Sequence, residues 1–103
     1  MKADLSLMQA SAADASRFLR ALANEKRLLM LCQLLDGERS VGVLAEAVGL
    51  SQSALSQHLT KLREDGLVAT RRDSQTIYYR LADPRIEAMI SLLYQQFCAP
   101  STR

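Results

Sequence analysis

Two cysteines, Cys32 and Cys98, are the residues of this chain best suited to covalent chemistry. A cysteine thiolate attacks a sulfane sulfur or a peroxide, and a second thiol can then capture the activated sulfur. A direct disulfide requires Cα atoms within about 7 Å, whereas a bridge that contains additional sulfur atoms spans somewhat more. The distance between the two sulfurs is left open by the sequence.

Each cysteine also has a purely structural interpretation. Cys32 falls in an apolar stripe, where a buried cysteine usually serves as a small hydrophobic residue. Cys98 lies near the end of the chain, where no packing role is obvious. A thiol enzyme is not expected, because the sequence has no Cys-x-x-Cys pair and no His/Asp partner set for a nucleophilic cysteine. No catalytic residue is therefore assigned.

Residues 51–63 have the pattern of a helix with two unlike faces. Leu55, Leu59 and Leu62 recur at i, i+4 and i+7, which predicts one apolar stripe. Ser51 is a good N-cap, because its hydroxyl can accept a hydrogen bond from a free N–H of the first turn. The other face carries short polar and amide groups rather than the Glu/Lys mixture of a solvated helix: Gln52, Ser53, Ser56, Gln57, Thr60 and Lys61.

A shorter helix is predicted just upstream, with Ser40 as its cap and Gly49-Leu50 as the tight turn that closes it. Two helices around a short glycine turn, the second with an amide-rich outer face, are typical of a helix-turn-helix. The second helix of that motif enters the major groove of DNA. We therefore expect double-stranded DNA as the partner; the alternative is that this polar face is merely solvated.

The expected DNA contacts divide into base readout and phosphate binding. Gln52 and Gln57 suit bidentate pairing with adenine edges, and serine hydroxyls can donate or accept at several bases. Phosphate contacts give affinity and salt dependence rather than sequence choice. The expected DNA-binding set is Ser51, Gln52, Ser53, Ser56, Gln57, His58, Thr60, Lys61, Arg63, Arg71, Arg72 and Gln75. For His58, the single histidine, a position between helices fits equally well.

A β-hairpin is predicted after the reading helix, from β-prone runs at residues 67–72 and 76–81 around a polar turn. A hairpin in this place is a wing, whose tip would bring Arg71, Arg72 and Gln75 to the phosphates or the minor groove. The alternative is a solvated hairpin with ordinary surface charges. In the second strand, inward-pointing side chains are expected at Ile77, Tyr79 and Leu81.

The remaining segments are predicted to be helical. One helix covers residues 5–23, with Leu7, Phe18, Leu19 and Leu22 as packing positions, and Asn24 caps the next, over residues 25–35. Asp83 and Pro84 open the last helix as N-cap and first helical residue. Its apolar arc is wider than packing on one small domain demands: Ile86, Met89, Ile90, Leu93, Tyr94 and Phe97. With the first helix it is the candidate interface of a homodimer, which would read a pseudo-palindromic site. The alternative is that it only closes the monomer core.

The 103 residues are expected to form one domain, 1–103, mainly α-helical with a β-hairpin wing. No signal-like segment or membrane-spanning apolar run is apparent, so we expect a cytoplasmic protein without a membrane partner. The net charge of +2 is too small to prove nucleic-acid binding. Residues 51–103 nevertheless hold seven basic and five acidic side chains, while residues 1–50 hold six of each.

Three segments resemble the ArsR/SmtB repressors: Ala23-Asn24-Glu25-Lys26-Arg27-Leu28, residues 50–59 and residues 62–68. The resemblance covers nearly the whole chain, and the middle segment is the specific one. It implies a homodimeric winged-helix repressor that releases operator DNA when an inducer binds. Most familiar members sense metals, but Ser40 and Gly42 stand where one metal site has cysteines, and the last helix contains no histidine. Neither metal site can be built, and no cofactor is expected.

Residues 27–32 and 94–98 are similar to the subgroup named for BigR, SqrR and HlyU, which senses reactive sulfur or oxidants through a cysteine pair. The resemblance implies that the reduced protein binds DNA and that a disulfide or polysulfide bridge between Cys32 and Cys98 lifts repression. The bridge would pull the last helix toward the second and change the spacing of the reading helices. Two alternatives stay open: a regulator that responds to haem or a soft metal through its cysteines, and an architectural or interaction module without an operator.

Overall fold

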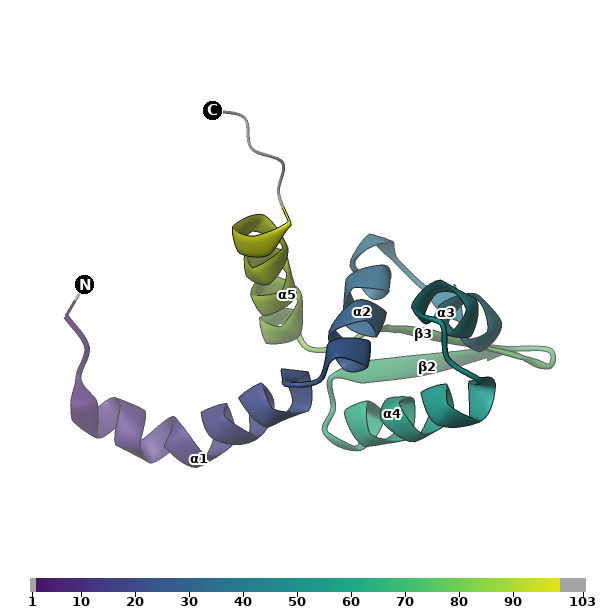
Figure 1. The fold of residues 1–103 in the computed structure, drawn as a ribbon. Helices are drawn as coiled ribbons and strands as arrows, with labels where there is room; N and C mark the ends of the chain where they lie inside the picture. Colours follow the sequence, from purple (N-terminus) through teal and green to yellow (C-terminus); the bar gives the residue numbers. More distant parts are fainter. Residues whose placement is uncertain (1, 99–103) are drawn as a thin grey trace.

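The computed structural model describes residues 2–98. Met1 and residues 99–103, the two ends of the domain predicted over 1–103, lie outside the described part. Figure 1 shows the order of elements. These are α1 (Leu5–Leu22), α2 (Glu25–Gln33), the 3₁₀ turn η1 (Leu34–Asp36), β1 (Arg39–Ser40), α3 (Val41–Val48), α4 (Gln52–Glu64), β2 (Val68–Asp73), β3 (Thr76–Leu81) and α5 (Pro84–Phe97). The predicted fold class, a mainly helical winged helix-turn-helix, is confirmed.

Local hydrogen bonds begin four helices where the sequence predicts them. The side chains of Asn24, Ser40, Ser51 and Asp83 each accept from a backbone N–H in the first turn of the helix that follows. Because each cap satisfies a donor that the helix itself leaves free, it sets the helix start locally. Gly49 ends α3 in the left-handed conformation, with φ of 71°, which orients the turn into α4.

The wing belongs to a three-stranded antiparallel sheet in the order β1-β3-β2. The pairing of β2 with β3 runs from Val68 opposite Leu81 to Asp73 opposite Thr76. The added strand β1 places Arg39 opposite Tyr79. The sequence did not predict this strand, because two residues carry no readable alternation of polar and apolar side chains.

A single hydrophobic core joins α2, α3, α4 and α5 over the sheet. Its most deeply buried side chains are Met30, Leu31, Leu44, Leu55, Leu59, Leu62, Ile86 and Ile90. The three leucines predicted for the inner face of α4 are all among them, so that face is fixed against the domain. The opposite face of the same helix is therefore held outward.

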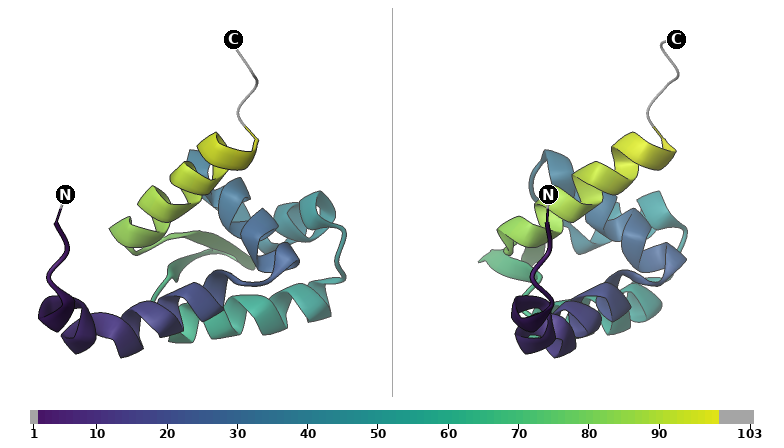
Figure 2. Two further views of the ribbon diagram at one scale, coloured as in Figure 1. Left: turned by 60° about the vertical axis from the view of Figure 1, so that its left-hand side comes forward. Right: turned by 90° about the vertical axis from the view of Figure 1, so that its left-hand side faces the viewer.

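Three packing predictions are wrong for the single chain. Leu7 and Leu19 are 70% and 54% exposed, because α1 extends away from the domain and meets it mainly at its C-terminal end, where Leu22 is buried (Figures 1 and 2). Ile77 is 39% exposed, because it pairs with Arg72 near the tip of the wing, beyond the core. Tyr79, two residues further along, is buried as predicted.

Candidate nucleic-acid interface and cysteine site

The outer face of α4 presents polar side chains to solvent in a continuous row. Exposed residues are Gln52, Ser53, Ser56, Gln57, Thr60, Lys61 and Arg63. His58 is half-buried, which suits a place at the edge of this face as well as a place between helices. The first turn contains no acidic residue, and Lys61 and Arg63 lie in the last turn. The surface is therefore rich in hydrogen-bonding groups that match base edges and phosphates.

Ser51 acts first as the cap of α4. Its Oγ accepts from the backbone N–H of Ala54 at 3.1 Å. The free hydroxyl hydrogen remains a donor, so a phosphate contact is compatible with capping. The cap also fixes the direction in which the first turn of α4 presents Gln52 and Ser53.

The wing tip lies beside the beginning of α4. A pocket of about 300 Å³ is lined by Ser40, Val41, Gly42, Gln52, Gln75, Thr76 and Ile77. The pocket brings Gln75, at the turn of the hairpin, together with Gln52, the first residue of the reading helix. The sequence predicts both glutamines as DNA-binding residues on separate elements, but it does not predict that they line one pocket.

The two wing arginines differ in their partners. Arg71 donates to both carboxylate oxygens of Glu38, and its guanidinium lies 4.7 Å from the centre of the Tyr78 ring. Its hydrogen bonds lower the pKa of the Glu38 carboxyl below its usual value. Arg72 makes one local hydrogen bond, from Nε to the carbonyl oxygen of Ser74 at 3.2 Å, and its side chain is exposed.

Cys32 and Cys98 meet in one pocket between α2 and the end of α5. The pocket has a volume of about 350 Å³ and an almost entirely apolar lining, which also includes Leu28, Leu29, Ile90, Leu93, Tyr94 and Phe97. Cys98 is exposed, Cys32 is half-buried, and both are free thiols. Burial raises the pKa of the Cys32 thiol, and the nearby Cys98 raises it further.

Apolar side chains remain uncovered on α1 and α5. The largest are Leu5, Leu7, Met8, Leu19, Leu92, Tyr94 and Phe97. Uncovered apolar groups on two helices are typical of a surface that pairs with another chain.

Over residues 2–98, no group of three or more His, Cys, Asp or Glu side chains is placed to hold a metal ion. No helix in the same part of the chain is long and apolar enough to cross a membrane.

A helix-turn-helix with an exposed amide-rich second helix, followed by a wing, defines a winged-helix DNA-binding regulator. Residues 24–70 match the family model described as "Bacterial regulatory protein, arsR family". The chain is also 52% identical over 95 residues to the transcriptional activator HlyU of Vibrio cholerae, covering 92% of this chain and 88% of that protein. The protein therefore belongs to the ArsR family of transcriptional regulators.

Solved structures of relatives have the same fold. Reduced HlyU from Vibrio cholerae superposes with a TM-score of 0.86 at 52% identity, covering 89% of this chain and 97% of that one. The transcriptional repressor BigR from Xylella fastidiosa superposes with a TM-score of 0.87 at 38% identity, covering 95% of this chain and all of the other. The predicted family resemblance is confirmed, and the relatives include both an activator and a repressor by name.

Proposed function

We propose that this regulator is a homodimeric repressor whose operator binding is switched by Cys32 and Cys98. The observation that carries the proposal is the shared apolar pocket of the two cysteines, between α2 and the end of α5. A covalent bridge in this pocket would join the two helices directly. The likeness of this chain to the transcriptional repressor BigR supports repression as the mode of regulation. In this proposal the reduced protein is the form that binds DNA.

The chemistry of the switch balances with a persulfide or a peroxide as the oxidant. One thiolate attacks a peroxide oxygen to give a sulfenic acid, with release of water from hydrogen peroxide or of an alcohol from an organic hydroperoxide. The second thiol then displaces water from the sulfenic acid to form the disulfide. With a persulfide RSSH, the first thiolate takes the sulfane sulfur and releases RSH. A second RSSH oxidises the resulting persulfide and remaining thiol to a trisulfide, with release of RSH and H₂S.

The link from the bridge to DNA passes through α5. The apolar side chains of α5 and α1 that the domain leaves exposed form the proposed homodimer interface. A bridge that shifts α5 relative to α2 changes the angle between the two protomers, and so the separation of the two α4 helices. A pseudo-palindromic operator fixes that separation at about one DNA turn, and a changed spacing weakens binding.

The DNA contacts in this proposal follow the exposed face of α4 and the wing. Base readout is assigned to Gln52, Ser53, Ser56 and Gln57. Thr60, Lys61, Arg63, Arg71, Arg72 and Gln75 are assigned to phosphates or the adjacent minor groove, with Ser51 and His58 at the edge of the surface. Double-stranded DNA is the partner, and the cytoplasm is the proposed compartment.

The test pairs intact mass with DNA binding. Reduced protein is used to select DNA from a random library, and its affinity for the selected duplex is measured before and after a low-molecular-weight persulfide and, separately, hydrogen peroxide. Loss of two hydrogens, with or without added sulfur, together with weaker DNA binding is expected. Cys32→Ser and Cys98→Ser are the matched controls and should keep their DNA affinity. Unchanged binding by the bridged wild-type protein would overturn the switch.

A further inference from the structure

We propose that a basic pocket between α1, α2 and α4 is a further DNA-phosphate contact surface, which extends from the end of the reading helix to the arginines of α1. The pocket is lined by Arg17, Arg20, Ala21, Arg27, Lys61 and Asp65, and its volume is about 460 Å³. Four cationic side chains from three helices surround one carboxylate. The inference rests on the proposed function, because its occupant is the backbone of the same DNA that α4 reads.

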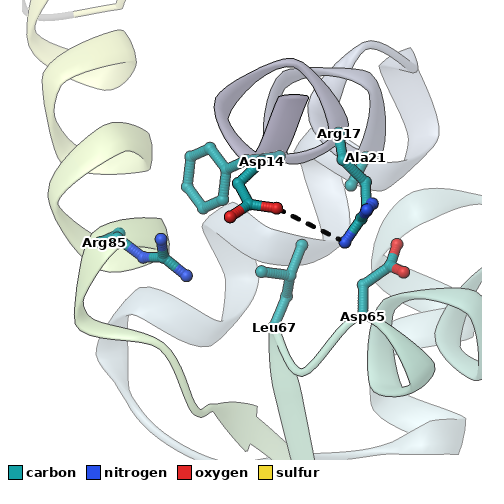
Figure 3. Close-up of a pocket in the computed structure, with 7 residues that line it drawn as sticks. Asp14, Arg17, Ala21, Asp65, Leu67 and Arg85 are labelled. Atoms are coloured by element: carbon teal, nitrogen blue, oxygen red, sulfur yellow. Dashed lines mark ion pairs between the residues drawn. The ribbon is translucent and has the colours of Figure 1, made fainter. Parts of the chain in front are cut away.

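The charge balance of the pocket favours a polyanion. Arg17 is partly engaged, with Nη1 3.9 Å from Asp14 Oδ1, and Figure 3 shows its guanidinium between Asp14 and Asp65. The Arg20 guanidinium has one neutral side-chain partner, the Ser16 hydroxyl at 3.4 Å. Lys61 is exposed and forms no ion pair within residues 2–98. Exposed arginine and lysine in a concave surface are the side chains that bind phosphate oxygens.

Arg27 holds the pocket together. Its Nε donates to the carbonyl oxygen of Ala21 at 2.8 Å, and its Nη2 donates to that of Arg20 at 3.3 Å. Both are carbonyls of the last turn of α1, where helical hydrogen bonds run out. The carbonyl oxygen of Arg20 also accepts from the backbone N–H of Ala23 at 3.3 Å. The contact therefore fixes the end of α1 against α2, and it keeps Arg17 and Arg20 on the side of α4.

The pocket continues the reading surface of α4. Ser53, Gln57 and Lys61 follow one another at intervals of four residues, so they form one row along the exposed face. Lys61 ends that row and also lines the basic pocket. In Figures 1 and 2 the C-terminal half of α1 lies on the same side of the domain as α4. A DNA strand that leaves the reading face past Lys61 thus meets the arginines of α1.

Dimerisation through one face of α1 leaves Arg17 accessible. Leu5, Met8 and Leu19 share that face by their helical spacing and are all exposed. Arg17 lies about 150° around the helix from the centre of this face, and Arg20 lies about 90° from it. A partner that covers the apolar face therefore leaves Arg17 on the open side of α1, with Arg20 at the edge of the interface.

The test is the salt dependence of DNA binding by the full chain. Arg17→Gln and Arg20→Gln are compared with wild type on the duplex that wild type selects from random DNA, between about 0.1 and 1 M salt. Each lost phosphate contact should lower the log–log salt slope by about 0.9, which weakens binding roughly eightfold at 0.1 M relative to 1 M. Base preference should be unchanged, because phosphate contacts carry no sequence information.

Two further variants sharpen the result. Asp65→Asn removes the carboxylate from the pocket and should strengthen binding at low salt by roughly threefold. Arg85→Gln is the matched control, since Arg85 lies outside the pocket and is paired with Asp83 at 2.7 Å; its salt slope should match that of wild type. Salt slopes for Arg17→Gln and Arg20→Gln equal to that of wild type would overturn this inference and leave the proposed function intact. A wild-type protein that selects no DNA sequence would overturn both.

Discussion

Arg71 of β2 and Glu38, just before β1, form a two-pronged ion pair that ties the wing to the loop preceding α3. Arg71 Nη2 lies 2.9 Å from Oε1, and Nε lies 3.1 Å from Oε2. Tyr78 supports the guanidinium from one side. Exposed pairs of this kind contribute little to stability. The pair does, however, neutralise one of the two wing arginines assigned to DNA.

Glu38→Gln should therefore strengthen DNA binding. Loss of the carboxylate frees the charge of Arg71 for a phosphate, so affinity at low salt should rise severalfold, and the salt slope should steepen by up to about one unit. The measurement is a salt titration of DNA affinity. Glu87→Gln, an equal charge change on the exposed side of α5, serves as control. Weaker binding by Glu38→Gln would show that the pair instead positions Arg71 for DNA.

The N-cap of α5 should make stability depend on pH. Asp83 Oδ1 accepts from the backbone N–H of Arg85 at 2.8 Å, and the Arg85 side chain lowers the pKa of the Asp83 carboxyl. A lowered pKa in the folded state stabilises the fold above the unfolded value of about 3.9, and this contribution is lost as the pH falls through the folded value. Asp83→Ala should cost about 1 kcal/mol at neutral pH.

Asp83→Asn separates capping from charge. The amide oxygen still accepts the capping hydrogen bond, so most of the neutral-pH stability should remain. The acid-dependent loss below about pH 4 should be smaller than in wild type. Urea unfolding at a series of pH values measures both effects. An equal acid loss in Asp83→Asn and wild type would assign the dependence to other carboxylates.

Local interactions were predictable from the sequence, and long-range ones were not. The caps of α3 and α4 and the inner leucines of α4 depend on residues only a few positions apart, so their spacing was sufficient. Glu38 and Arg71 are 33 positions apart, and no local pattern marks them as partners. Alternation in β3 predicted Tyr79 correctly but placed Ile77 inward, because alternation does not indicate where the core ends.

The candidate sites show the same division. The polar row of α4 was readable, since helical periodicity alone separates it from the leucines. The common pocket of Cys32 and Cys98 depends on how α5 crosses α2, and so sequence left the distance between them open. The basic pocket was not predicted at all. Arg17 and Arg20 resemble ordinary surface charges until the fold brings α1 beside Lys61.

Leu19→Asp should weaken the proposed dimer. Leu19 is 54% exposed on α1, away from the domain core, so the change should leave the fold of each protomer intact. A carboxylate buried in an apolar interface without a partner is unfavourable. The dimer should therefore have a higher Kd, so that monomer appears at a higher protein concentration than in wild type. Sedimentation equilibrium measures the change. Ala13→Asp, on another face of α1, is the control and should remain dimeric. A Leu19→Asp protein with the dimer affinity of wild type would exclude the Leu19 face of α1 from the interface.

Gln57→Ala should change base preference rather than general affinity for DNA. Gln57 lies in the middle of the exposed row of α4, and an amide paired with adenine discriminates by about 1–3 kcal/mol. Preference at one base position in each half-site should be relaxed. Lys61→Gln is the contrasting variant, since it should weaken binding uniformly and lower the salt slope. Binding of both variants to a library of single-base operator changes tests the difference. An unaltered preference in Gln57→Ala would remove Gln57 from base readout.

The two thiols should differ in their reactivity. Cys98 is exposed, whereas Cys32 is half-buried and has a raised pKa, so less of its thiolate is present at neutral pH. Iodoacetamide should therefore modify Cys98 first. In Cys98→Ser the pH midpoint for alkylation of Cys32 should move down, because the charge of Cys98 is the second cause of the raised pKa. It should stay above that of an ordinary thiol, because burial is the larger cause. Peptide mass spectrometry across a pH series follows each site, and an unchanged midpoint in Cys98→Ser would mean that the two sulfurs do not interact.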